Sequence, residues 1–381
     1  MKKILLLSFV CVSLVCCGII SKNSDNSTFH SAIVQSEKVT VPESQTPVYL
    51  GGYGSSMAYC AADSAFYLLT DRGPNVEGAT PESKVFALPD FVPHIGKFRL
   101  QNGEWVLMEK IEFKEPGGTP FSGIPNAEGN GSTNETAYNL RGEVIGNSGR
   151  RGIDPEGLAV APDGTFWISD EYAPYVLHFD KNGFLLETLS PFNGSLPAYY
   201  ATRRPNRGME GLTISRDGKT LTGIMQSPLA GAENPLQVRI ISIDLRTKKV
   251  SEYFYPLSDA TTMVSEILFV KENEFLVLER DGSFPKNGNG FKKIFKINTA
   301  TTDNNGVLEK ELYLDILAAI PDYPHDKPEG IAFVNNGKMI GIVNDDDFGI
   351  NAPEKPDGTL VPKLTANALP DRNVLYFVKI K

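Results

Sequence analysis

The chain has 381 residues, of which 41% are hydrophobic and 22% are charged. This composition excludes an intrinsically disordered chain and is sufficient for one large core. The formal net charge of −9 at pH 7 argues against nonspecific binding of nucleic acid and favours cations or small solutes as partners. Short alternating segments between Asp-Gly and Asn-Gly turns predict an all-β chain.

The first segment, MKKILLLSFVCVSLVCC, has the two lysines and the apolar run of a signal peptide, and it is too short to span a bilayer. Leu14 lies three residues before Cys17, as in a bacterial lipobox, so we predict a signal peptide over residues 1–17 and lipidation of Cys17. Ordinary signal cleavage is the alternative. The Ser/Asn-rich residues 18–46 are predicted to be a flexible tether. The protein is therefore expected to be exported to the cell envelope, in the periplasm or at the outer-membrane surface, and to contact the membrane only through a lipid anchor.

Residues 47–381 are predicted to form one domain, because one pattern recurs through them. Four copies align as a glutamate, a short apolar strand, a turn, a second apolar strand and polar residues: DPEGLAVAPDGTFWISDEY, GMEGLTISRDGKTLTGIMQ, MVSEILFVKENEFLVLERD and KPEGIAFVNNGKMIGIVND. A fifth copy, GSSMAYCAADSAFYLLTDRGPN, has Ser55 in place of the glutamate. The segments between the copies hold further strand pairs, so the pattern predicts a β-propeller of five or six four-stranded blades.

Three segments depart from the repeat. Residues 114–150 are rich in Gly, Asn and Thr and are predicted to be a long loop over one face. Residues 74–93 are a second insertion, between the strands of the first blade, and an insertion is where a sixth blade would be hidden. The C-terminal segment NVLYFVKIK alternates as a strand does, and we expect it to close the ring beside a strand from the N-terminal side.

The repeat predicts a ring of acids at one mouth of the propeller, because the innermost strand of every blade lines the central channel. The residues just before that strand, and just after its partner, therefore converge from all blades. The predicted ring consists of Glu156, Glu210, Glu266 and Glu329, joined by Asp71, Asp170, Glu171, Glu279, Asp281 and residues 344–347. Glu-Gly and Asp-Gly also form simple turns, but turn chemistry gives no reason to repeat glutamate four times.

Carboxylates gathered in a partly desolvated channel repel each other unless positive charge compensates them. Oxygen ligands without cysteine or clustered histidine favour a hard cation, Ca²⁺ before Mg²⁺. The predicted metal ligands are Glu156, Glu210, Glu266, Glu329, Asp281, Asn344 and Asp345.

Basic residues recur beside the acids and predict a small anionic or phosphorylated ligand at the same rim. The predicted contacts are Arg151, Arg207, Arg280 and Lys327. The alternative is that they only pair with neighbouring carboxylates. Serine hydrolase chemistry is not expected, because no G-x-S-x-G elbow occurs. His325 is interpreted as a solvated loop histidine rather than a general acid or base, and His178 as a packed or edge side chain of a strand.

The motifs DPEGLAV…FWISDEY, GMEGLTIS…MQ, LVLERD and KPEGIAF…NDDDFG resemble the phytase-like propeller family described as having the esterase-like activity of phytase. The resemblance covers about residues 49–381. It implies a β-propeller that hydrolyses phosphate esters through conserved acids. The positions that it carries over are Glu156, Asp170, Glu171, Glu210, Glu266 and Glu329 as catalytic acids, with Glu279, Arg280, Asp281, Asn344 and Asp345 beside them. A non-catalytic binding or scaffold propeller with a structural cation, and a lactonase-type propeller, remain the alternatives.

Overall fold

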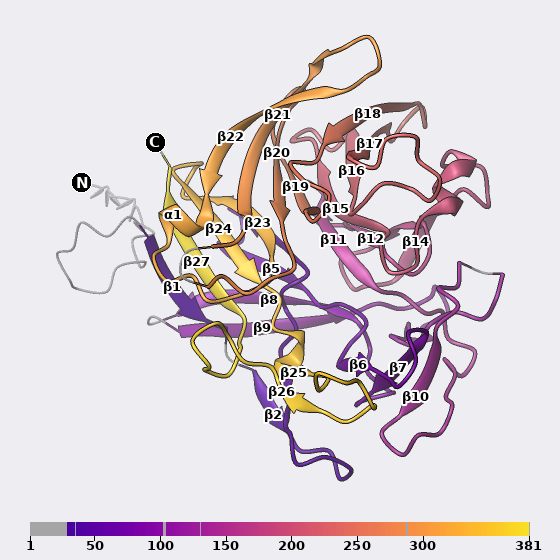
Figure 1. Cartoon of the computed structure of the whole chain (residues 1–381). Coiled ribbons are helices and arrows are strands. Elements are labelled where there is room, and N and C mark those ends of the chain that lie inside the picture. The colour runs from indigo at the N-terminus through magenta and orange to yellow at the C-terminus, as the bar shows by residue number, and fades with distance from the viewer. Residues whose placement is uncertain (1–28, 35, 102–103, 130, 287–288, 381) are drawn as a thin grey trace, which may run out of the picture.

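The computed structural model describes residues 29–34, 36–101, 104–129, 131–286 and 289–380. Most of them form five four-stranded antiparallel sheets, which we number as blades 1 to 5 (Figure 1). From the innermost strand outward, blade 1 consists of β4 (Ser56–Cys60), β5 (Ala65–Leu69), β8 (His94–Gln101) and β9 (Glu104–Glu112). Blade 2 consists of β11 (Pro155–Val160), β12 (Phe166–Asp170), β13 (Val176–Phe179) and β14 (Leu185–Leu189).

The other three blades repeat this order. Blade 3 consists of β15 (Met209–Ile214), β16 (Thr220–Met225), β17 (Gln237–Asp244) and β18 (Val250–Pro256). Blade 4 consists of β19 (Met263–Lys271), β20 (Glu274–Arg280), β21 (Lys292–Thr302) and β22 (Leu308–Asp315). Blade 5 consists of β23 (Pro328–Val334), β24 (Met339–Asn344), β27 (Val374–Lys379) and β1 (Phe29–Ile33).

The innermost strands close into a ring of five. β4 packs beside β11, β11 beside β15, β15 beside β19, β19 beside β23, and β23 beside β4. The predicted β-propeller is therefore confirmed, with five blades, and the described residues hold no sixth blade in the ring. Apolar side chains between the blades form the core, of which the largest cluster joins blades 2, 3 and 4.

Blade 5 is completed by both ends of the chain. β27 pairs with β24 on one side and with β1 on the other, so that Ser31 lies opposite Tyr376, and Figure 1 shows the indigo β1 beside the yellow β27. The prediction that the C-terminal strand closes the ring beside an N-terminal strand is confirmed. β1 falls within residues 18–46, so the predicted tether is too long: backbone pairing fixes the chain from Phe29 onward. The predicted signal peptide and Cys17 lie outside the described residues.

The two insertions come together in a small sheet beside the ring (Figure 1). β6 (Asn75–Glu77) pairs with β7 (Ser83–Phe86), and β10 (Thr136–Asn139), from the segment predicted as a long loop, runs parallel to β7. Two further two-stranded sheets and three short helices lie outside the blades: β2 (Glu37–Val39) with β3 (Val48–Leu50), β25 (Ile350–Asn351) with β26 (Val361–Pro362), η1 (Ala198–Thr202), α1 (Ile316–Ala319) and η2 (Asp347–Gly349). None of the helices in the described part of the chain has the length and apolar character needed to span a membrane.

The Glu-Gly pairs have a local structural cause. Each of β11, β15 and β23 opens with a β-bulge, and the bulged residue is the glutamate. The glycine that follows allows the inner strands to approach each other closely. A Cβ atom on Gly157 would lie 2.7 Å from the backbone nitrogen of Leu212, and one on Gly211 would lie 2.5 Å from that of Ile267. The bulge therefore aims the glutamate away from the ladder, and the glycine makes room for the next blade.

Candidate functional site

A cavity of about 410 Å³ lies at the mouth of the propeller, where the blades and the insertion sheet meet. Its walls contain ten acidic and four basic side chains. The acids are Asp71, Glu77, Asp154, Glu156, Glu171, Glu210, Asp326, Glu329, Asp345 and Asp347, and the bases are Arg72, Lys84, Arg280 and Lys327. The gathering of acids from separate blades thus occurs as the repeat implies, with an excess of negative charge that requires compensation.

Three of the four glutamates predicted for the ring line the cavity, and the fourth does not. The bulge of β19 lies between Val264 and Glu266, so Ser265 occupies the place that Glu156 and the other bulged glutamates have. Glu266 takes the place of the glycine. The prediction that Glu266 belongs to the ring of acids is wrong. The four sequence copies were aligned on their glutamates, but in β19 the glutamate comes one residue after the bulged position.

Glu266 is buried among the inner strands and does not line the cavity. Its side chain is 2% exposed, and its Oε1 accepts hydrogen bonds from the backbone N–H groups of Leu212 (3.2 Å) and Ile267 (2.9 Å). Ser56 Oγ, from the opposite blade, donates to its Oε2. Burial raises the pKa of this carboxyl group, and the hydrogen bonds oppose that effect. Glu266 is therefore a structural acid that occupies the space left by the glycines of the neighbouring blades.

The strongest cluster for a cation is Asp154, Glu156 and Glu171. One carboxylate oxygen from each lies within 4.8 Å of the other two. Asp154 and Glu171 are 1% and 6% exposed, whereas Glu156 is partly exposed. The backbone N–H of Arg72 donates to Asp154 Oδ1 over 3.0 Å and fixes that carboxylate. Asp154 was not predicted as a ligand, although it belongs to the same DPEG motif as Glu156.

Crowding of like charges changes the acidity of this cluster. Burial, followed by the charge of Asp154, raises the pKa of Glu171 to about 8. Burial and the neighbouring carboxylates of Asp154 and Glu210 raise the pKa of Glu156 well above its usual range. Both effects disfavour the charged form, and a bound cation would favour it. The three carboxyl groups thus lie close together with too little positive charge nearby to stabilise all of them in the ionised form.

Two buried carboxylate oxygens in the same cavity accept no hydrogen bond from the described residues: Asp154 Oδ2 and Glu210 Oε2. The other oxygen of Glu210 accepts a hydrogen bond from Gln226 Nε2 at 2.7 Å, and the same nitrogen lies 3.3 Å from Glu171 Oε1. Asp154 Oδ2 lies 3.3 Å from Arg72 Nη1 in an ion pair, so Glu210 Oε2 is the oxygen left without a partner among the described residues, which is costly for a buried carboxylate. The donor set consists only of oxygens, and it fits a hard cation such as Ca²⁺.

Four of the predicted mouth acids and amides lie behind or outside the cavity wall, because they end strands whose side chains point between blades. Asp170 accepts the backbone N–H groups of Asp154 and Tyr172. Glu279 accepts from Tyr255, Thr262 and Lys310. Asp281 pairs with Lys292, and Asn344 accepts the N–H of Val374. None of these four residues lines the cavity, so the structure does not bring Asp281 and Asn344 together with the other predicted cation ligands.

Two of the four predicted basic contacts line the cavity, and both are already paired. Arg280 forms an ion pair with Glu329 at 2.5 Å and donates to Ser265 Oγ at 2.8 Å. Lys327 pairs with Asp345 at 3.2 Å and with Asp347 at 2.6 Å.

The other two predicted basic contacts lie elsewhere: Arg151 pairs with Glu115 at 2.9 Å, and Arg207 is exposed. Sequence analysis missed the remaining two cavity cations. Arg72 follows β5 and contacts Asp154 at 3.3 Å, while Lys84 lies on the insertion strand β7. The position of Arg72 directly after Asp71, at the end of a strand, was an available signal.

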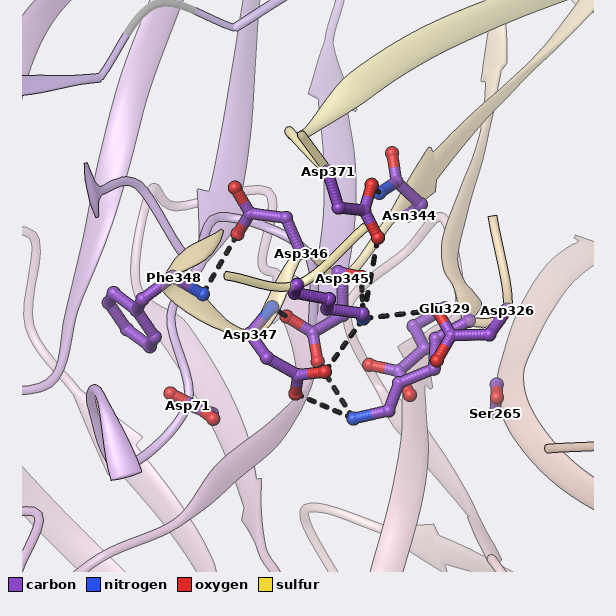
Figure 2. A network of polar contacts seen from close by, with 12 residues as sticks. Asp71, Ser265, Asp326, Glu329, Asn344, Asp345, Asp346, Asp347, Phe348 and Asp371 are labelled. Atoms are coloured by element: carbon purple, nitrogen blue, oxygen red, sulfur yellow. Dashed lines mark hydrogen bonds and ion pairs between the residues drawn. The ribbon is translucent and has the colours of Figure 1, made fainter. Parts of the chain in front are cut away.

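The segment NDDDFG at the end of β24 contributes to the wall on the side of blade 5 (Figure 2). Asp345 and Asp347 line the cavity, whereas Asp346 caps the short helix η2 by accepting the N–H of Phe348. Asp347 and Phe348 both have left-handed backbone angles, with φ of 46° and 56°, which non-glycine residues rarely adopt. The turn is therefore held by its side-chain contacts.

Neither His325 nor His178 lines the cavity. His325 is 2% exposed and lies between Asp371 (2.7 Å from Nδ1) and the hydroxyl of Tyr376 (2.9 Å from Nε2). The interpretation of His325 as a solvated loop residue is wrong, because the C-terminal segment covers it. His178 stacks on Trp167 with ring centroids 4.1 Å apart, as expected for a packed strand residue.

Similar proteins were found both by sequence and by structure. An uncharacterized secreted protein of Arthroderma benhamiae is 28% identical over 319 residues, which are 64% of this chain and 62% of that protein. Among solved structures, the periplasmic gluconolactonase PpgL of Pseudomonas aeruginosa is 10% identical over 93% of this chain and 100% of that chain, with a TM-score of 0.39. The β-propeller domain of Cps50 (Swd1) of Myceliophteria thermophila is 9% identical over 86% of this chain and 97% of that chain, with a TM-score of 0.35. The five closed blades establish the architecture here without these structures.

The family profile described as "Esterase-like activity of phytase" matches residues 48–348. The matched residues include every Glu-Gly motif and all ten acids that line the cavity. The resemblance inferred from the four motifs is thereby confirmed, and the chain belongs to the Phytase-like family.

Proposed function

We propose that this protein is an exported, cation-dependent hydrolase whose acidic cavity cleaves ester bonds, with phosphate esters as the first substrate class. The observation that carries the proposal is the convergence of Asp154, Glu156 and Glu171 beside the unpartnered oxygen of Glu210. Membership of the Phytase-like family supports hydrolysis, and the secreted relative supports export. Lipid attachment at Cys17 is the further part of the proposal, based on the lipobox-like sequence.

Asp154, Glu156 and Glu171 are the residues that would hold the cation, and Ca²⁺ suits their oxygen ligands better than Mg²⁺. A bound cation would polarise the phosphoryl or carbonyl oxygen of an ester. Gln226 keeps the carboxylates of Glu171 and Glu210 in fixed orientations through its Nε2. The free Oε2 of Glu210 can hold a proton or accept one from water, which is the role of a general acid–base group.

The basic side chains support an anionic substrate only together with a cation. Arg280 and Lys327 line the cavity, but each already contacts a carboxylate. With ten acids against four bases in the wall, a phosphate ester meets net repulsion unless positive charge enters with it. We therefore propose that the phosphorylated substrate and the cation bind as a coupled pair.

The same pairing favours a second candidate function, a binding or scaffold propeller with a structural cation. If the basic groups serve only as counter-charges for the acid ring, no ligand clamp exists, and the cation stabilises the fold alone. A lactonase-type activity would use the same polarised carbonyl chemistry without any need for a phosphate contact.

The test is a substrate panel of phosphomonoesters, phosphodiesters and lactones, assayed with Ca²⁺ and with chelator. Turnover should require Ca²⁺ and should be lost in Glu171→Gln, which removes a predicted cation oxygen. Asp217→Asn, an exposed acid remote from the cavity lining, is the matched control and should keep the parent's turnover. Hydrolysis of lactones alone would assign the lactonase activity. Ca²⁺ binding without turnover of any substrate would assign the structural-cation propeller and refute the hydrolase.

A further inference from the structure

We propose that the ammonium group of Lys363 is a cation built in behind the cavity wall, held in a carboxylate cage that takes up Ca²⁺ when the lysine is removed. Lys363 is thus a positioning residue for Asp326 and Asp347, which line the cavity. The inference deepens the proposed function and rests on it only in treating this cavity as the working site.

Lys363 is buried behind the wall and does not itself line the cavity. Its side chain is 1% exposed. Its Nζ lies 3.0 Å from Asp326 Oδ1, 2.7 Å from Asp347 Oδ2 and 3.5 Å from Asp371 Oδ2. The backbone carbonyl of Asp345 accepts a hydrogen bond from the same nitrogen at 3.2 Å. Figure 2 shows the carboxylates of Asp326, Asp347 and Asp371 turned toward one point.

The cage depends on this ammonium. Asp326 Oδ1 and Asp371 Oδ2 are buried and accept no hydrogen bond from the described residues, so the ion pair with Lys363 is the compensation that the structure provides for them. A buried carboxylate without a partner is strongly destabilising. All four oxygens around Nζ come from carboxylates or a carbonyl group, which are the ligands of a hard cation.

The cage fixes the strained turn of blade 5. Asp347 has one oxygen on buried Lys363 and the other, at 2.6 Å, on Lys327, whose side chain is 31% exposed. It therefore lies between an inaccessible cation and one that faces the cavity. The left-handed φ angles of Asp347 and Phe348 are retained because these contacts and the packing of Phe348 against Gly52 over-determine the turn.

The lysine comes from a segment that lies beyond the family match, which ends at residue 348. Backbone hydrogen bonds anchor it on both sides: the N–H of Lys363 donates to Gly349 O at 3.0 Å, and the N–H of Asp371 donates to Lys363 O at 2.9 Å. Residues 350–373 therefore complete the cavity from behind, and the functional unit extends past the matched residues.

The experiment measures Ca²⁺ stoichiometry by calorimetry, and melting temperature, for the parent and for Lys363→Ala. In chelator, the variant should melt about 5 °C or more below the parent, because a buried ion cluster has lost its cation. In Ca²⁺ it should bind one more ion per chain than the parent and recover most of that shift. Ethylammonium, which matches the deleted end of the side chain, should also raise the melting temperature of the variant but not that of the parent.

Lys292→Ala is the matched control. Lys292 is equally buried and pairs with Asp281, but its other contacts are backbone carbonyl groups of Asp281 and Ser283. This variant should lose stability, bind no additional Ca²⁺ and show no recovery with ethylammonium, since one carboxylate does not make a cage.

The proposal is overturned if Lys363→Ala binds the same number of Ca²⁺ ions as the parent and neither cation restores its melting temperature. Should the variant fold only poorly, Lys363→Asn is refolded in Ca²⁺ and in chelator; recovery in Ca²⁺ alone supports the cage, and failure in both overturns it. A parent that binds no Ca²⁺ refutes the proposed function, whereas an ion gained by the Lys363 variants in that case still supports this inference.

Discussion

Glu266 offers a sharp test of the distinction between structural and site carboxylates. Its replacement by alanine leaves the backbone N–H groups of Leu212 and Ile267 without their acceptor, at hydrogen-bond lengths of 3.2 and 2.9 Å in the parent. Each buried donor without a partner costs about 1–3 kcal/mol. Removal of the buried carboxyl group returns part of this cost, so we expect a net loss of about 3 kcal/mol in the free energy of unfolding.

The assay is denaturant unfolding together with thermal melting, each in Ca²⁺ and in chelator. A loss of about 3 kcal/mol corresponds to a shift of roughly 4 °C for a chain of this size. The shift should be the same in both conditions, because Glu266 does not line the cavity in which we propose the cation to bind. Glu210→Ala is the control at the neighbouring blade: it should cost less in chelator, since its Oε2 accepts no hydrogen bond, and it should weaken the stabilisation by Ca²⁺.

The reasoning is refuted if Glu266→Ala unfolds at the parent's denaturant concentration, or if its loss of stability appears only when Ca²⁺ is present. The first result would mean that the channel N–H groups find other partners. The second would return Glu266 to the predicted acid ring.

The remaining predictions concern packing, pH and metal. Gly211→Ala should lower stability by about 2–3 kcal/mol or more, because its Cβ would lie 2.5 Å from the nitrogen of Ile267; Gly282→Ala, where a Cβ meets open space, should be nearly neutral, and equal melting of the two variants would contradict the close-approach argument. Burial lowers the pKa of His94 to about 3, so the unfolded chain binds more protons between pH 6.5 and 3, and this group should remove about 2 kcal/mol of stability as the pH falls from 7 to 5. His94→Gln should show a correspondingly flatter pH dependence in denaturant titrations, and an unchanged slope would refute the assignment. Ca²⁺ should raise the melting temperature of the parent but not that of Glu171→Gln, measured by calorimetry; equal shifts in both would exclude Glu171 as a ligand.

The architecture was predictable because its signals are local. In β11, β15 and β23 the Glu-Gly pair marks a β-bulge at the glutamate and a close contact between inner strands at the glycine. These two structural features are therefore encoded by adjacent residues. The number of blades could not be predicted from local sequence signals, because it depends on which inner strands pack together. The contact of β23 with β4 closes the ring after five blades. The strand β1 was missed as part of the domain because five residues carry little periodicity.

The cavity was predictable only in part, for two physical reasons. A bulge shifts the register by one residue, so Glu266 was placed in the ring and Ser265 was not considered. Residues at the end of a strand face alternate sides, so Glu279 and its neighbour Asp281 point away from the mouth although they follow the same motif as Glu171. Arg72, Lys84 and Lys363 come from segments without any repeat, and no spacing argument could place them beside the acids.

The chemistry of the cavity arises where the repeat fails. With glutamate at the corresponding position of all five blades, the mouth would be a symmetric ring of like charges that only a central cation could stabilise. Blade 4 has Ser265 there instead, and the smaller side chain accepts Arg280 Nε at 2.8 Å, which places a guanidinium group beside Glu329 in the wall. Blade 5 adds Lys327 and, from behind, Lys363. Blades 4 and 5 thus supply Arg280, Lys327 and Lys363, while Arg72, which follows β5 of blade 1, lies 3.3 Å from Asp154 Oδ2. The Oε2 atom of Glu210 in blade 3 remains without a hydrogen-bond donor among the described residues. A cation bound beside Glu210 would share the cavity with Arg280 and Lys327, and this combination would suit the metal-bridged ester of the proposed function.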